Sequence, residues 1–167
     1  MSKEQVQLTV NGRRYDVAVP ANKLLLDALR EDLRLTGAKR GCDDSSCGCC
    51  TVLVDGVPML SCVLLAASCQ EVEITTIEGV AEDGRLDPLQ EGFCVEAGAQ
   101  CGYCTPGIIL VARALLARNP NPTRQQIAEA LSGNLCRCTG YEQIYSSIEH
   151  AFKKLQRVAV EGRTREA

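Results

Sequence analysis

Three kinds of residue are scarce in this chain of 167 residues, and each scarcity narrows what the chain can be. There is one histidine, His150, so any metal site must draw almost all of its ligands from other residue types. There is no tryptophan and aromatic residues make up only 4% of the chain, so its core must be packed with Leu, Val, Ile and Ala. Small cores built from light residues often depend on covalent or metal cross-links for stability.

Basic clusters and long apolar runs are also missing. The 18 Lys and Arg residues are scattered and the formal net charge is −3, which argues against a nucleic-acid-binding protein. The longest apolar stretch, 108–116, is interrupted by Arg113 and is too short to span a bilayer. The N-terminus, Met1 to Gln5, is polar and lacks the apolar segment of a secretory signal. We therefore expect a soluble, cytoplasmic protein with no membrane span.

Cysteine, in contrast, is abundant, with eleven residues. The cytoplasm keeps thiols reduced, so disulfides are a poor explanation for so many cysteines in a cytoplasmic chain. The odd count also argues against complete pairing. Ligation of metal by thiolates is the leading explanation.

Strand and turn patterns dominate the first 75 residues or so. Residues 5–10 and 14–19 alternate at period two on either side of Asn11-Gly12, the strongest short-range hairpin signal. The order of elements resembles the β-grasp of plant-type ferredoxins. The further predicted elements are a helix over 24–33 ended by Gly37, a cysteine-rich loop over 41–50, a hairpin over 51–60 around Asp55-Gly56, a helical turn within 62–69 and a strand over 72–74.

Helical patterns replace the strands from about residue 86. We predict four helices: 86–98, 105–118 with Thr105 as N-cap and Pro106 at the first position, 123–133 opened by a capping box, and 142–157. The fold class is therefore α+β. The predicted domains are a plant-type ferredoxin-like β-grasp domain (1–77), a linker (78–87), a helical domain (88–157) and a flexible polar tail (158–167).

Four cysteines of the first domain have the spacing of plant-type ferredoxins, C-x4-C-x2-C with a fourth cysteine further along. They are Cys42, Cys47, Cys50 and Cys62, here called site 1. Three thiolates on one loop must converge on two adjacent irons, and Gly41 and Gly48 give the backbone the freedom to wrap around them. The sequence therefore predicts a [2Fe–2S] cluster at site 1.

The third ligand of site 1 has two candidates, because Cys49 and Cys50 are adjacent. The x2 spacing favours Cys50, and Cys49 would then be a small buried side chain. Both alternatives stay open at this point.

A second set of four cysteines flanks two predicted helices. Cys101 and Cys104 precede one helix, and Cys136 and Cys138 follow the next; these four are here called site 2. If the two helices are antiparallel neighbours, the four thiolates meet at one end of the bundle, and a helix N-terminus lies beside them. Taken alone, this set fits structural zinc or iron–sulfur about equally, and site 1 tilts the balance towards a second [2Fe–2S] cluster.

The remaining thiols, Cys69 and Cys94, need no function and are expected to behave as small apolar residues. We also expect His150 to be a surface or packing residue rather than a ligand.

Three motifs in this order resemble the iron–sulfur subunit of the molybdenum hydroxylases, the xanthine oxidase family. They are 41–51, 100–107 and 133–141, and the resemblance extends over about 5–157. The family includes aldehyde oxidoreductases, carbon monoxide dehydrogenase, N-heterocycle dehydrogenases and 4-hydroxybenzoyl-CoA reductase. The main departure is Cys49, where the family usually has a small residue without a thiol, often Ala.

The resemblance implies a β-grasp domain followed by a four-helix bundle, with one [2Fe–2S] cluster in each. It implies that site 2 lies nearer a molybdopterin held by a large partner subunit, with Gln100 and Cys138 approaching the pterin across the interface. It places site 1 towards FAD in a medium subunit, where one exists, and suggests a dimer of heterotrimers.

The expected function is one-electron relay between molybdopterin and FAD or another acceptor within an oxidoreductase complex. The chain itself would hold no substrate site and no catalytic residue. The alternatives are a free-standing [2Fe–2S] electron carrier or redox sensor, and a structural zinc-binding module.

Overall fold

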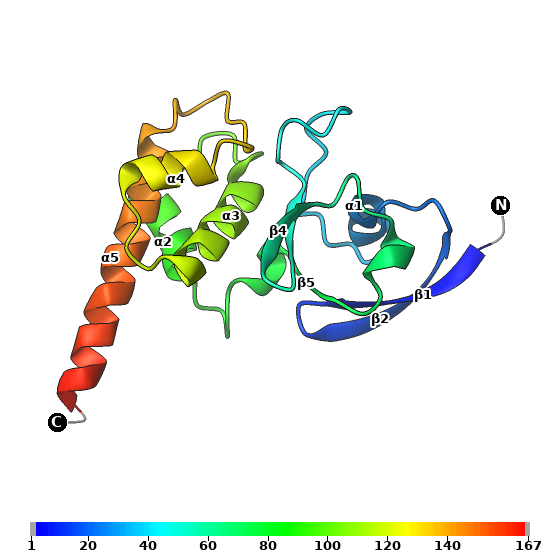
Figure 1. Cartoon of the computed structure of the whole chain (residues 1–167), viewed down its shortest axis with the longest axis horizontal. Helices are drawn as coiled ribbons and strands as arrows, with labels where there is room; N and C mark the ends of the chain where they lie inside the picture. Colours follow the sequence, from blue (N-terminus) through cyan, green and yellow to red (C-terminus); the bar gives the residue numbers. More distant parts are fainter. Residues whose placement is uncertain (1–2, 166–167) are drawn as a thin grey trace.

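The computed structural model describes residues 3–165, with the side chains of residues 3–157, and has an α+β fold with a mixed sheet. Figure 1 shows the strands gathered around one end of the molecule and the long helices at the other. The strands are β1 (Lys3–Val10), β2 (Arg13–Pro20), β3 (Thr51–Val54), β4 (Val57–Leu60) and β5 (Glu73–Thr75); the helices are α1 (Leu25–Asp27), α2 (Pro88–Val95), α3 (Thr105–Arg118), α4 (Arg124–Ala130) and α5 (Glu142–Arg165).

The sheet has the strand order β2-β1-β5-β3-β4, so its centre is formed by strands from distant parts of the sequence. Both predicted hairpins are present: β1 pairs antiparallel with β2, and β3 with β4. Their turns, Asn11-Gly12 and Asp55-Gly56, have positive φ at both residues, which is the reason these dipeptides favour tight hairpins. β5 joins the two hairpins, because it pairs parallel with β1 and antiparallel with β3.

The first helical segment is shorter than predicted and ends differently. α1 continues as a π-helix over Ala28–Asp32, and Arg34 then adopts a left-handed conformation with φ 61°. The prediction that Gly37 ends the helix is therefore wrong, because the chain leaves the helix at Leu33 and Arg34. Leu25, Leu26 and Leu29 are fully buried, so this segment covers the inner face of the sheet.

The four later helices are present with some shifted ends. α2 begins at Pro88, after Asp87 caps it in a capping box, and ends at Val95, inside the predicted range. The N-cap of α3 is Cys104, and Thr105 is its first helical residue rather than its cap. The capping box of α4 pairs Thr123 with Gln126, as predicted. Pairs of these helices pack closely, since a Cβ on Gly92 of α2 would lie 2.3 Å from the Ser147 carbonyl oxygen of α5.

α5 is longer than predicted. It continues to Arg165, past the predicted end near 157 and into the predicted tail, 158–167. Residues 158–165 contain no proline, and most of them are tolerated in helices, so nothing in this stretch stops the helix. The last two residues of the predicted tail lie outside the described residues.

Two hydrophobic clusters form the interior. One lies under the sheet and contains Leu8, Leu26 and Ile74; the other lies among the helices and contains Ile108, Ile127 and Ile148. The cysteine-rich loop is divided between them: Cys50 belongs to the sheet cluster, and Cys47 and Cys49 belong to the helical cluster. Within residues 3–165, no helix is long and apolar enough to cross a membrane.

Candidate metal centre

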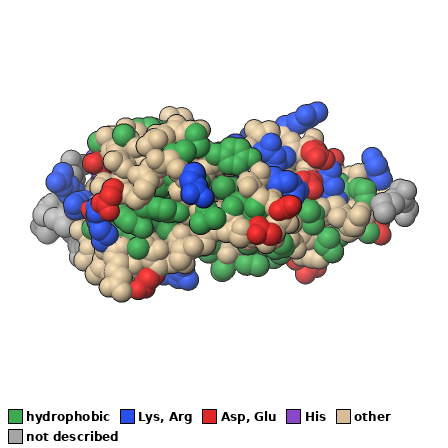
Figure 2. Space-filling view, turned by 90° about the horizontal axis from the view of Figure 1, so that it is seen from above, with side chains coloured by type: hydrophobic (Ala, Val, Ile, Leu, Met, Phe, Trp, Pro, Cys, Tyr) green, Lys and Arg blue, Asp and Glu red, His purple; other side chains and the backbone are tan. Residues whose placement is uncertain are grey.

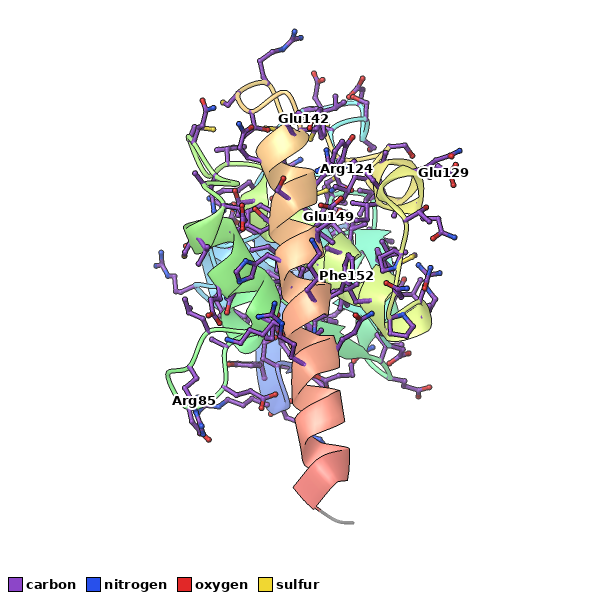
Figure 3. The ribbon with its side chains drawn as sticks, turned by 90° about the vertical axis from the view of Figure 1, so that its left-hand side faces the viewer. Arg85, Arg124, Glu129, Glu142, Glu149 and Phe152 are labelled. Atoms are coloured by element: carbon purple, nitrogen blue, oxygen red, sulfur yellow. The ribbon has the colours of Figure 1, made fainter. Side chains whose placement is uncertain are left out.

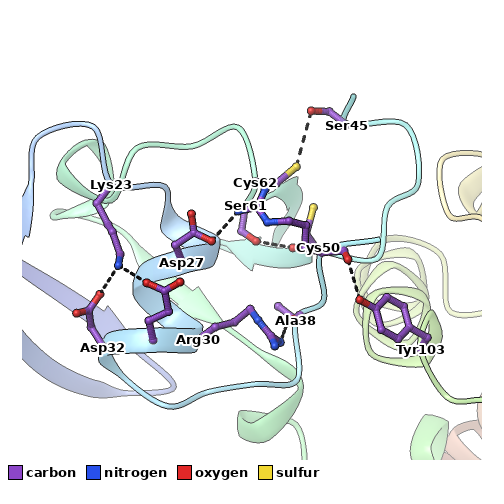
Figure 4. A network of polar contacts seen from close by, with 12 residues as sticks. Lys23, Asp27, Arg30, Asp32, Ala38, Ser45, Cys50, Ser61, Cys62 and Tyr103 are labelled. Carbon is purple, nitrogen blue, oxygen red and sulfur yellow. Dashed lines mark hydrogen bonds and ion pairs between the residues drawn. The ribbon is translucent and has the colours of Figure 1, made fainter. Parts of the chain in front are cut away.

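Site 1 is built on the loop between the first helical segment and β3, and it is completed by Cys62 just after β4. The loop turns through Ser45 and Gly48, which have φ 65° and 69°. Cys62 is tied to the loop on both sides. The Ser61 hydroxyl donates to the Cys50 carbonyl oxygen at 2.7 Å, and Cys62 Sγ lies 3.7 Å from Ser45 Oγ (Figure 4).

The thiols of site 1 lie close to one another. The Cys42 side chain is within hydrogen-bonding reach of Cys47, which the Cys49 side chain also reaches, and the Cys50 side chain is within reach of Cys62. In a [2Fe–2S] cluster bound by four cysteines, each of the two irons takes two thiolates. The structure therefore brings the four predicted site-1 residues close together, with Cys49 beside Cys47.

The pKa values of two site-1 thiols, Cys42 and Cys50, are shifted in opposite directions. The backbone N–H of Cys47, and then its side chain, lower the pKa of Cys42. Burial raises the pKa of Cys50 to about 11, so without metal this thiol keeps its proton at neutral pH. Metal binds the thiolate, and loading site 1 must therefore release protons from its buried members.

Cys49 is buried and lies against the ligand loop rather than against Cys62. Its Sγ is 3.9 Å from the Cys47 carbonyl oxygen, and burial raises its pKa to about 12. The backbone of Gly41 faces the same thiols, since a Cβ there would lie 2.9 Å from Cys47 Sγ and 3.0 Å from Cys49 Sγ. Gly41 therefore leaves the space that the sulfur atoms occupy, which fits a loop closely wrapped around a cluster.

Site 2 brings together the Cys101–Cys104 loop before α3 and the Cys136–Cys138 loop between α4 and α5. Cys101 Sγ and Cys138 Sγ lie 3.5 Å apart, and the side chains of Cys104 and Cys136 are within hydrogen-bonding reach of each other. The four thiols of site 2 form two pairs. Within the described residues no three Cys, His, Asp or Glu side chains surround a single ion position.

The two pairs of site 2 lie in different surroundings. Cys101 and Cys138 are exposed, whereas Cys104 is buried, and burial raises its pKa to about 12. Burial also acts to raise the pKa of Cys136, but the Thr139 hydroxyl, 3.2 Å from its Sγ, and backbone N–H groups outweigh it and lower the pKa overall. One side of site 2 therefore opens to the surface, and the other faces the helical core.

The start of α3 supports an anionic group at site 2. Cys104 is the N-cap, so the unpaired backbone N–H groups of the first turn lie beside the thiols. The Thr105 hydroxyl is buried and has no hydrogen-bond partner among the described residues. A buried hydroxyl without a partner is costly, and this one directly follows the site-2 residue Cys104 in the sequence. The donor set of each site thus fits a [2Fe–2S] cluster held by four thiolates.

The residues predicted to meet a pterin are on the open side. Gln100 and Cys138 are both exposed; Gln100 precedes Cys101 in the sequence, and Cys138 Sγ lies 3.5 Å from Cys101 Sγ. Figure 2 looks onto the face of the molecule where the loops over 42–50 and 133–141 lie, and it shows apolar side chains among the charged ones. Two of the remaining cysteines differ in burial: Cys69 is buried as expected, but Cys94 is exposed. His150 Nδ1 lies 3.1 Å from Glu96 Oε1.

Sequence reasoning missed the residues that join the two sites. The Asn134 side chain donates to the Gly48 carbonyl oxygen at 3.0 Å, and the Leu135 backbone N–H donates to the Cys47 carbonyl oxygen at 2.9 Å. Within the Cys101–Cys104 loop, the Tyr103 hydroxyl donates to the backbone carbonyl oxygen of residue 40 at 2.7 Å (Figure 4). The available signal was the position of these residues directly beside the cysteines.

Comparison with known proteins agrees with the two sites. A family model described as a 2Fe-2S iron–sulfur cluster binding domain matches residues 8–73, and one described as a [2Fe-2S] binding domain matches residues 76–149. The second match favours iron–sulfur over zinc at site 2. The two sites thus define the class: an iron–sulfur protein with two [2Fe–2S] domains.

Whole-chain relatives narrow the class. The chain is 50% identical to the nicotinate dehydrogenase small FeS subunit of Eubacterium barkeri, over 92% of this chain and 98% of the relative. It is 49% identical to the nicotine 6-hydroxylase small subunit of Paenarthrobacter nicotinovorans, over 86% and 87%. A chain in the crystal structure of quinoline 2-oxidoreductase from Pseudomonas putida 86 superposes with a TM-score of 0.89 at 42% identity, over 94% and 98%.

The chain belongs to the small iron–sulfur subunits of the molybdenum hydroxylase (xanthine oxidase) family. It is therefore a subunit of an oxidoreductase, which confirms the resemblance drawn from the three motifs.

Proposed function

We propose that this chain relays electrons one at a time between a molybdopterin in a large partner subunit and FAD or another acceptor. The single observation that carries the proposal is that one chain of this family brings together two separate sets of four cysteines. When bound, a [2Fe–2S] cluster supplies one-electron redox chemistry, which suits a relay between two-electron centres.

The proposed ligands are those predicted from the spacing, Cys42, Cys47, Cys50 and Cys62 for the first cluster and Cys101, Cys104, Cys136 and Cys138 for the second. The sheet with its covering helix is proposed as a ferredoxin-like β-grasp domain, and α2 to α5 as a four-helix domain. The pairing of Cys50 with Cys62, while Cys49 contacts Cys47, supports Cys50 as the third ligand of site 1.

The protein's own contribution is to hold and bias the two sites. Thiolates from separate elements fix each site, and burial of Cys50 and Cys104 limits contact with water. Backbone N–H groups beside Cys42 and at the start of α3 stabilise negative charge. Hydrogen bonds and burial of this kind set the reduction potential of an iron–sulfur cluster.

The partners are proposed from the exposed sides of the sites. The open side of site 2, with Gln100 and Cys138, faces the pterin; the amide of Gln100 can both donate and accept hydrogen bonds at a pterin edge. Site 1 faces a medium FAD subunit or another acceptor. We propose a cytoplasmic complex assembled as a dimer of heterotrimers.

The names of three relatives support one proposal for the substrate class. Nicotinate, nicotine and quinoline, which appear in the names of the compared proteins, all contain a nitrogen heteroaromatic ring. We propose that the large subunit acts on a compound of this class, and that no substrate contact lies on the present chain.

Affinity purification of the tagged chain from its native host under anaerobic conditions tests this function. We expect a complex much larger than the 18.0 kDa chain, with molybdenum in a separate polypeptide. Adding the substrate of that complex should bleach the visible absorbance of the [2Fe–2S] clusters, because the electrons pass into this subunit. An isolated 18.0 kDa protein that exchanges electrons without partners would contradict the proposal and favour a free-standing carrier.

A further inference from the structure

The loops that carry the two sites touch each other directly. The Leu135 backbone N–H, one residue before Cys136, donates to the Cys47 carbonyl oxygen at 2.9 Å. The Asn134 side-chain amide donates to the carbonyl oxygen of Gly48, one residue after Cys47, at 3.0 Å. Gly48 and Asn134 are 86 positions apart in the sequence, and each lies close to a proposed ligand. Their hydrogen bond therefore links the two sites.

Asn134 is held rigidly on its own side of this contact. It is 4% exposed, and its backbone N–H donates to the Leu131 carbonyl oxygen. Its backbone carbonyl oxygen accepts a hydrogen bond from the Tyr141 hydroxyl at 2.9 Å, and the Cys136 backbone N–H donates to the same hydroxyl at 2.8 Å. Tyr141 therefore ties Asn134 to a proposed ligand of site 2.

The acceptor is equally fixed on the side of site 1. The Gly48 carbonyl oxygen also accepts from the Thr51 hydroxyl at 2.7 Å and from the Thr51 backbone N–H at 3.1 Å. Thr51 is buried and begins β3, so this oxygen is anchored to the sheet. The Asn134 amide adds a donor from the helical half of the molecule to the same atom.

The surrounding backbone leaves no room for adjustment. A Cβ on Gly48 would lie 2.3 Å from the Gly133 carbonyl oxygen and 2.7 Å from Asn134 Nδ2, and a Cβ on Gly107 of α3 would lie 2.6 Å from the Gly48 carbonyl oxygen. Three backbone segments therefore meet here: the site-1 loop, the start of α3 after Cys104, and the segment before Cys136. A buried hydrogen bond in so close a contact fixes the relative position of its two sides.

We infer that Asn134 is a positioning residue that sets the placement of the two cluster sites relative to each other, and through it the electron transfer between them. The inference rests on the proposed function. The rate of transfer between two redox centres falls steeply as their separation grows. Asn suits this position because its amide donates, whereas the carboxylate of Asp would face the Gly48 carbonyl oxygen with another acceptor.

The test uses the intact chain with both clusters loaded and compares it with Asn134→Asp, an isosteric change that removes the donor. Electron paramagnetic resonance of the fully reduced protein measures the magnetic interaction between the clusters, which depends on their separation and orientation. We expect a changed interaction and a several-fold slower equilibration of electrons between the clusters, with the iron content retained. Ser147→Ala is the matched control, because it removes another buried side-chain hydrogen bond, 2.7 Å long and internal to α5.

The outcomes separate the inference from the proposed function. An unchanged magnetic interaction and unchanged equilibration in Asn134→Asp with full iron would overturn the inference and leave the relay proposal standing. If Asn134→Asp loses iron, Asn134→Ser, which is too short to reach Gly48, is measured in the same way. Loss of iron from both variants, with full iron in Ser147→Ala, would make Asn134 a folding residue and also overturn the inference. Iron missing from the unmodified chain would instead contradict the proposed function.

Discussion

The Tyr103 hydroxyl donates a hydrogen bond of 2.7 Å to the backbone carbonyl oxygen of Arg40. Tyr103 lies between Cys101 and Cys104 in the sequence, and Arg40 lies two residues before Cys42 of site 1. The Arg40 side chain, in turn, pairs with Asp27 in the helical segment under the sheet. This contact is a second link between the two halves of the chain, made by different residues from the hydrogen bond between Asn134 and Gly48.

Tyr103→Phe removes the hydrogen bond to Arg40 and keeps the aromatic ring. The side chain is 44% exposed, so the change disturbs little packing. A net loss of about 0.5–1.5 kcal/mol in the free energy of unfolding is expected for one hydrogen bond, and exposure favours the lower end. Denaturant unfolding of the loaded chain measures it. Tyr145→Phe serves as the control, since Tyr145 contacts Tyr141 and Arg124 through its ring. Equal effects of the two changes would show that the hydroxyl of Tyr103 contributes nothing.

The choice between Cys49 and Cys50 can be decided by single substitutions. Cys49→Ala should keep all of the iron, because Cys49 contacts the Cys47 carbonyl oxygen and is not paired with Cys62. Cys50→Ala should lose the iron of site 1, because it removes the thiol that pairs with Cys62. Cys69→Ala is the control, because it removes another buried thiol that is not a proposed ligand. This variant should keep all of the iron. The opposite pattern, with iron lost from Cys49→Ala alone, would make Cys49 the third ligand.

Gly48→Ala should prevent assembly of both sites. Its φ of 69° strains any residue with a Cβ, and that Cβ would meet the Gly133 carbonyl oxygen at 2.3 Å. Gly84→Ala is a matched control, with φ 74° and no neighbour within 4 Å. The control should cost only the backbone strain, about 1–3 kcal/mol. Iron content and visible absorbance of both variants give the answer, and full iron in Gly48→Ala would refute the close contact described here.

An ion-pair network joins α4 to α5 and makes stability depend on pH. Arg124 donates to Glu149 at 2.8 Å and to Glu142 at 2.7 Å (Figure 3), and its hydrogen bond lowers the pKa of Glu149. A carboxylate with a lowered pKa contributes stability that is fully present above its unfolded value of about 4.5. That contribution is lost as the pH falls through the lower, folded pKa.

Arg124→Gln should therefore lower the thermal midpoint by a constant amount between pH 6 and pH 8, and the difference should narrow only below about pH 4.5. Helical circular dichroism follows the transition, and the shift is small because the guanidinium is exposed. Arg85→Gln removes the same charge from an exposed turn away from this network (Figure 3) and should show no such pattern. A difference that narrows between pH 6 and pH 8 would rule out Glu149 as the group responsible.

Local signals in the sequence were sufficient for much of the fold. Asn-Gly and Asp-Gly favour positive φ, so both hairpins could be placed to within two or three residues at each end. The capping box at Thr123 and the stop at Asn119 to Pro122 delimited α4 and the end of α3 for similar local reasons. The cysteine spacing predicted site 1, because three of its members lie within nine residues.

The rest depends on contacts between distant segments, which no local pattern encodes. The hydrogen bond from Asn134 to Gly48 exists only because the helices dock against the site-1 loop; the position of each residue beside a cysteine marks the residue but does not indicate its partner. The helical period likewise does not indicate the π-helix after α1 or the left-handed Arg34; Leu29 in this segment belongs to the sheet cluster. Exposure of Cys94 escaped prediction because free cysteine is usually buried.

Iron and acid-labile sulfide in the anaerobically purified chain test the central claim most directly. Each [2Fe–2S] cluster contains two irons and two sulfides. Two matched domains with one cluster each therefore require four irons and four sulfides for each chain. Two irons, or zinc in place of iron at the Cys101, Cys104, Cys136 and Cys138 site, would contradict it.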